Sequence, residues 1–145
     1  MSTVMNDVLE QIRNFLEEIE GKYYYDENKK IIGFQVSTES KLRLIHYRIV
    51  VDEYGYTVCA TVPVNADKDT RLSVMEYITR INYMLRNGSF EMDLSDGEVR
   101  YKCYFLIKDL DKIPQTMIEE SILLPKLMYD RYGDGLAALI DTVMG

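Results

Sequence analysis

The stretch at residues 89–107, SFEMDLSDGEVRYKCYFLI, carries the clearest structural signal in the chain. Apolar side chains occupy every second position on both sides of Asp96-Gly97, a dipeptide that strongly favours a tight hairpin turn. Such alternation is typical of a strand with one buried face and one exposed face. The stretch therefore predicts an antiparallel hairpin made of residues 90–94 and 99–107.

Similar alternation occurs earlier in the chain, over residues 32–36, 42–51 and 56–64. Short polar turns separate these segments, which favours an antiparallel meander of three strands. Residues 42–51 carry apolar side chains at both parities, so we expect this strand to be central. Residues 23–25 can add a short strand before the meander.

Two segments have apolar residues at spacings of three and four, which predicts amphipathic helices over residues 3–20 and 70–87. We expect Gly21 to end the first helix in the left-handed conformation. The second helix can be capped by the side chain of Asp69 or Thr70, and Asn87-Gly88 is a strong stop signal.

The last segment, residues 114–143, is also helical in its spacing but contains two breaks. Pro125 should kink or split a helix because its ring removes one hydrogen bond and clashes with the carbonyl group one turn earlier. Gly133-Asp134-Gly135 interrupts the same pattern. We therefore expect two helical pieces joined at these glycines.

The predicted order is helix, three-stranded antiparallel meander, helix, β-hairpin and one or two final helices. Strands grouped in this way between amphipathic helices indicate an α+β fold. The length of 145 residues fits a single domain over residues 1–145. We expect the helices to cover mainly one face of the sheet and to leave the other face free for a partner.

Charge and hydropathy exclude several classes of function. The chain has 17 basic and 24 acidic residues, a net charge of −7. Affinity for nucleic acid comes mainly from clustered Lys and Arg, so we expect no nucleic-acid partner. No run approaches the roughly 18 apolar residues that a membrane span needs, and the first residues lack the features of a signal peptide. We expect a cytoplasmic protein without a membrane partner.

The sequence from the second helix into the hairpin resembles the YbjN family of bacterial proteins. The resemblance rests on INYMLRNGSFEMDL at residues 81–94, continued by DGEVRY at residues 96–101. In that family a helix ending in a leucine-asparagine step leads through a glycine to an aromatic strand and an Asp-Gly turn. The order of elements is also similar to the fold of type III secretion chaperones.

The resemblance implies a function in binding and gives no catalytic residues. YbjN-like proteins are described as candidate regulators of sensory transduction, and secretion chaperones of this fold are homodimers that hold extended client segments. A homodimer contact is therefore expected on the second helix, whose apolar stripe is formed by Val74, Ile78, Ile81 and Leu85.

Few residues point to chemistry. His46 is the only imidazole, and a catalytic His needs both a nucleophile and an orienting partner. The strand pattern places Cys103 on an apolar face and Cys59 on the opposite one, so no disulfide is expected. Turn and cap roles explain the acidic residues better than metal binding does. These are Asp93, Asp96, Asp130, Asp134 and Asp141. We expect no metal and no cofactor.

Tyrosine is abundant, with 12 Tyr against 4 Phe. Its apolar ring and polar hydroxyl suit surfaces that are wet when free and buried when bound. Two interpretations remain open, because tyrosines can also line the edge of a core. On the first interpretation, the predicted partner-binding surface comprises Tyr47, Tyr56, Tyr101 and Tyr104.

The leading hypothesis is a non-enzymatic protein- or peptide-binding module, chaperone-like or regulatory, that acts as a homodimer. The alternative is a small-molecule-binding protein or an enzyme. Its site would be assembled from dispersed residues such as His46, Tyr47, Arg48, Cys59 and Asp93.

Overall fold

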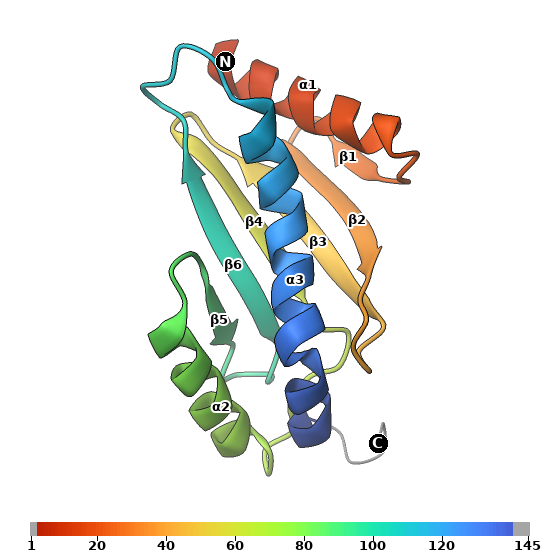
Figure 1. Cartoon of the computed structure of the whole chain (residues 1–145), viewed down its shortest axis with the longest axis vertical. Helices are drawn as coiled ribbons and strands as arrows, with labels where there is room; N and C mark the ends of the chain where they lie inside the picture. Colours follow the sequence, from red (N-terminus) through yellow and green to blue (C-terminus); the bar gives the residue numbers. More distant parts are fainter. Residues whose placement is uncertain (1–2, 141–145) are drawn as a thin grey trace.

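The chain folds into helices packed on one antiparallel sheet. The computed structural model describes residues 3–140 (Figure 1). In chain order its elements are α1 Thr3–Glu18, β1 Tyr24–Asp26, β2 Ile31–Ser37, β3 Leu44–Val51, β4 Gly55–Thr61, α2 Arg71–Met84, β5 Ser89–Met92, β6 Val99–Leu106 and α3 Gln115–Ile140. The predicted α+β class is confirmed. The six strands lie in the order β1-β2-β3-β4-β6-β5.

Every neighbouring pair of strands is antiparallel, and β1 is the short strand that the sequence allows at residues 23–25. The predicted hairpin is confirmed, because β5 pairs with β6 and Gly97 adopts a φ of 82° in the turn between them. The pairing of β4 with β6 then joins the two groups of strands into one sheet.

The helices cover only one face of the sheet. Along β3 the side chains of Ile45, Tyr47 and Ile49 are buried, while His46 and Arg48 between them are exposed. Figure 1 shows α3 running across the sheet, with α1 beside its first turns and α2 beside its last turns. The core therefore lies between this helical layer and the covered face.

The last segment differs from its prediction, because α3 is a single helix from Gln115 to Ile140 that contains both Pro125 and the two glycines. A proline inside a helix leaves nearby backbone groups without their usual partners. In α3, a tyrosine of the sheet bonds to backbone groups next to Pro125. Side chains of a loop and of α2 pack against the two glycines.

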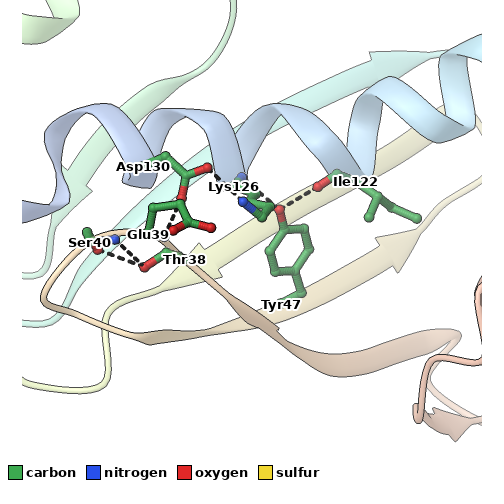
Figure 2. Close-up of polar contacts among 7 residues, drawn as sticks. All are labelled: Thr38, Glu39, Ser40, Tyr47, Ile122, Lys126 and Asp130. Atoms are coloured by element: carbon green, nitrogen blue, oxygen red, sulfur yellow. Dashed lines mark hydrogen bonds and ion pairs between the residues drawn. The ribbon is translucent and has the colours of Figure 1, made fainter.

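Tyr47 of β3 reaches α3 between Ile122 and Lys126, the residue after Pro125 (Figure 2). Its hydroxyl donates a hydrogen bond to the carbonyl oxygen of Ile122 at 2.5 Å and accepts one from the backbone N–H of Lys126 at 2.9 Å. Ile122 and Lys126 are the pair four residues apart that a regular helix joins directly. The hydroxyl therefore bridges the turn that the proline weakens, and it ties the sheet to the helix.

The two glycines allow other segments to approach α3 closely. A Cβ atom at Gly133 would lie 2.6 Å from Cβ of Ser40, and one at Gly135 would lie 2.1 Å from the hydroxyl oxygen of Tyr77. The neighbouring aspartates are not the turn and cap residues that the sequence predicts. Asp130 accepts a hydrogen bond from the backbone N–H of Glu39, and Asp134 accepts one from that of Lys41.

The predicted helix ends need three corrections. Glu20, not Gly21, takes the left-handed conformation after α1, with a φ of 57°. Asp67 accepts hydrogen bonds from the backbone N–H groups of Asp69 and Thr70 before α2, and the Thr70 side chain makes no cap. The helix ends at Met84, before the predicted stop. Asp141 and the predicted helical residues after Ile140 lie outside the described residues.

Tyr47→Phe should lower the free energy of unfolding by about 1–3 kcal/mol, because it removes the hydroxyl that is the partner of a buried carbonyl oxygen and of a partly buried N–H group. Urea unfolding at neutral pH measures this change. Tyr83→Phe is the matched control, since Tyr83 is 92% exposed on α2 and should change stability by less than about 0.5 kcal/mol. Equal stability of the Tyr47 variant and the wild type would contradict the bridge.

Candidate functional site

The face of the sheet turned away from the helices presents side chains from every strand. We call it the open face. Its residues alternate with the buried ones along each strand and keep the same register across the sheet. They are Tyr24, Asp26, Ile31, Gly33, Gln35, Ser37, Leu44, His46, Arg48, Val50, Thr57, Cys59, Thr61, Ser89, Glu91, Arg100, Lys102, Tyr104 and Leu106.

The open face is hollowed over its central strands. The hollow has a volume of about 890 Å³ and is lined by residues of β1, β2, β3, β4 and β6. Its floor is mixed in character, with aliphatic Val50, hydroxyl-bearing Thr57 and Thr61, and charged Arg48 and Lys102. A surface of this breadth suits a chain segment or a flat ligand better than a small enclosed molecule.

One row of paired residues crosses the middle of the hollow. Gly33 pairs with Arg48, Arg48 with Cys59, and Cys59 with Lys102. Directly opposite residues on neighbouring strands are cross-strand neighbours, so the half-buried thiol of Cys59 lies between two cations. Gly33 has no side chain, which leaves space beside Arg48.

Lys102 and one further cation, Arg100, share one carboxylate at the edge of the hollow. Glu91 of β5 binds Nε of Arg100 at 2.8 Å and Nζ of Lys102 at 3.0 Å. Desolvation acts to raise the pKa of Glu91, but the hydrogen bonds from Lys102 and Arg100 outweigh it and lower the pKa below its usual value. Glu91 is therefore ionised at neutral pH and fixes these two side chains.

Cys59 is not an activated nucleophile. Desolvation raises the pKa of its thiol, and the attraction of Arg100, Lys102 and Arg48 offsets this only in part. In residues 3–140 the thiol has no hydrogen bond to His46, whose ring bonds instead to the side chain of Gln35 at 3.4 Å. Within the described residues Cys59 is thus not paired with a base, which is one of the ways in which a catalytic Cys is activated.

The structure gathers part of the dispersed set predicted for an enzyme or small-molecule site. His46, Arg48 and Cys59 all line the hollow. Tyr47 contributes only its backbone there, because its side chain points to α3. Asp93 lies in the turn after β5, where its carboxylate accepts hydrogen bonds from the backbone N–H and hydroxyl of Ser95.

The predicted tyrosine surface is corrected. Tyr47, Tyr56 and Tyr101 are buried on the covered face, and only Tyr104 is exposed on the open face. Buried hydroxyls need partners, and Tyr101 donates to the carbonyl oxygen of Asn87 at 2.6 Å. Burial also raises the pKa of Tyr56 to about 12. Of the two interpretations left open, core packing holds for these three residues.

The predicted dimer contact also lies inside the chain. Val74, Ile78 and Ile81 are buried, and Leu85 packs against the core. These side chains fill the space between α2 and its neighbours α3 and β5. The exposed apolar side chains on or beside this stretch are different ones, namely Leu72, Met75, Tyr83 and Met84.

Residues 3–140 bring no three His, Cys, Asp or Glu side chains together in a group able to hold a metal ion. Over the same range no helix is both long and apolar enough to span a membrane.

No protein-family model and no curated protein matches the chain. Among solved structures, the crystal structure of YbjN from E. coli, described as a candidate transcription regulator, superposes with a TM-score of 0.64. The chain has a YbjN-like fold. The match covers 90% of this chain and 91% of YbjN at 8% sequence identity, so the likeness to YbjN concerns the fold alone. The similarity to secretion chaperones remains a prediction.

Arg100, Lys102 and Glu91 are not among the site residues predicted from the sequence. Their positions between the apolar residues of the hairpin already indicate an exposed face. The missing information is the pairing of β4 with β6, strands that are not consecutive in the chain. Without it, nothing places Lys102 beside Cys59 or Arg100 beside Thr61.

The two cysteines report on the two faces of the sheet. In the folded protein, a thiol reagent should modify Cys59 slowly, because burial raises its pKa, and should leave the buried Cys103 unmodified. Peptide mapping after timed labelling measures both rates. Cys59→Ser should abolish labelling under native conditions, and urea should expose the remaining thiol. Labelling of Cys103 as fast as Cys59 in the native protein would contradict the assignment of faces.

Proposed function

We propose that the protein is a non-enzymatic binding module that holds a segment of another protein against the open face, in a chaperone-like or regulatory role. One observation supports this most strongly. The helices and the buried tyrosines close one face of the sheet, while the other face offers a broad hollow of about 890 Å³ with polar and aliphatic side chains. A regulatory or binding role is also compatible with the YbjN-like fold.

The homodimer stays part of the proposal, with a changed contact. Because the predicted residues lie in the core, the outer side of α2 is the part of this helix left for a second copy. Leu72 is 76% exposed there, and Tyr83 is 92% exposed.

The alternative, a small-molecule-binding protein or an enzyme, is favoured by one arrangement. His46, Arg48 and Cys59 come from two strands and meet in a single hollow. The hollow is wide, and Cys59 lacks a paired base in the described residues, so binding of a ligand fits this arrangement better than catalysis.

Cys59 allows a direct test, because its thiol can carry a photoactivated cross-linker into the hollow. In an extract of the native host, we expect the probe to capture a protein. The matched control places the same probe on α3, with Thr116→Cys in a Cys59→Ser background, because Thr116 is exposed and lies outside both the hollow and α2. The captured protein is then purified and its affinity measured for two variants. Thr57→Trp fills the hollow and should weaken binding at least about tenfold, a loss of roughly 1.4 kcal/mol.

Thr116→Trp on the exposed side of α3 should bind like the wild type. Equal capture from both probe positions, or equal binding by the two tryptophan variants, would overturn the proposal. Native mass spectrometry that finds a small molecule displaced by Thr57→Trp, with no captured protein, would favour the alternative.

A further inference from the structure

The hollow of the open face is lined by more cations than anions, although the whole chain carries a charge of −7. Its basic side chains come from the β1–β2 turn, β3 and β6, and they are Lys29, Arg48, Arg100 and Lys102. Two carboxylates, Asp26 and Glu98, lie at the same hollow. Glu91 lies beside it and binds both Arg100 and Lys102. The sign of charge on this surface is thus opposite to that of the protein as a whole.

Arg48 is the cation best placed to meet a ligand. Its side chain is exposed, and its guanidinium has no ion pair or hydrogen bond within residues 3–140. A guanidinium carries five N–H donors in a planar fork that matches a carboxylate. Gly33, opposite Arg48, has no side chain. The space beside it is open, since a Cβ atom there would meet nothing closer than a backbone oxygen at 3.7 Å.

The other cations extend this surface across β4. Neighbouring strands lie about 4.8 Å apart, so Arg48 and Lys102, on either side of β4, start about 10 Å from each other. Arg100 and Lys102 are two residues apart on β6 and share the single carboxylate of Glu91. Both remain partly exposed, at 42% and 38% of their side-chain surface. Each therefore keeps donors that an incoming anion can use.

We propose that the segment held on the open face is acidic, with one carboxylate bound by Arg48 and further carboxylates near Arg100 and Lys102. This inference rests on the proposed function and adds the chemistry of the partner. In an extended chain, alternate side chains repeat about every 6.6 Å, the same spacing that separates Arg100 from Lys102 along β6. A long nucleic acid fits less well, because the net negative charge of the protein repels a polyanion that extends beyond the hollow.

The test uses labelled probes and fluorescence anisotropy at low salt. A peptide of alternating Glu and Thr should bind the wild type at least about tenfold more tightly than the matched peptides of Gln and Thr or of Lys and Thr, and added salt should weaken it. Arg48→Gln should weaken binding of the Glu peptide about fivefold to tenfold. Arg131→Gln is the control, since this substitution removes the same charge from an exposed residue of α3. It should change binding by less than about twofold.

Every other outcome overturns the inference in a recognisable way. Equal binding of the Gln peptide would show that charge does not select the segment, and the proposed function would stand. Tighter binding of oligothymidylate, again weakened by Arg48→Gln, would make the partner a nucleic acid. No binding by any probe, or equal effects of the two arginine variants, would contradict the proposal that the bound segment is acidic. Photo-cross-linking from Cys59 then decides the proposed function separately.

Discussion

The hydroxyl of Tyr47 joins the sheet to α3 at the turn that Pro125 weakens. It lies between the carbonyl of Ile122 and the N–H of Lys126 and bonds to both, so a residue of the central strand supplies a partner to two backbone groups of the helix. The same helix also holds the loop before β3, because Asp130 and Asp134 accept hydrogen bonds from backbone N–H groups of that loop. These contacts fix α3 across one face of the sheet, and α1 and α2 both contact α3.

The two faces of the sheet therefore have different roles in this account: the covered face forms the core, and the open face is the proposed binding surface. Tyrosines and aliphatic residues fill the covered face, and each of Tyr47, Tyr101 and Tyr129 satisfies its hydroxyl on a backbone carbonyl. The open face keeps charged and hydroxyl-bearing side chains around a hollow. A protein with a net charge of −7 thereby presents a locally basic surface, which favours an acidic partner in the proposed binding role.

Local patterns in the sequence predict most of the elements, because alternation and helical spacing depend only on near neighbours. The hairpin around Asp96-Gly97 and the opposite faces of Cys59 and Cys103 follow from such patterns. What they miss depends on contacts between distant segments. Nothing near Gly133-Asp134-Gly135 in sequence indicates that Ser40 and Tyr77 pack against the two glycines, so the predicted break there was wrong. In the same way, nothing near Pro125 indicates that Tyr47 bonds to the helix there. For the same reason the pairing of β4 with β6, and the basic hollow it creates, could not be predicted.

A double-mutant cycle between Tyr47→Phe and Pro125→Ala tests the bridge most directly. With alanine at position 125, the N–H of Lys126 can bond to the carbonyl of Ile122 without help, so loss of the hydroxyl should cost less than it does beside proline. The free energies of unfolding should therefore show a coupling of about 0.5–2 kcal/mol. Additive effects, within about 0.3 kcal/mol, would show that Tyr47 stabilises the fold independently of the proline and would contradict this account.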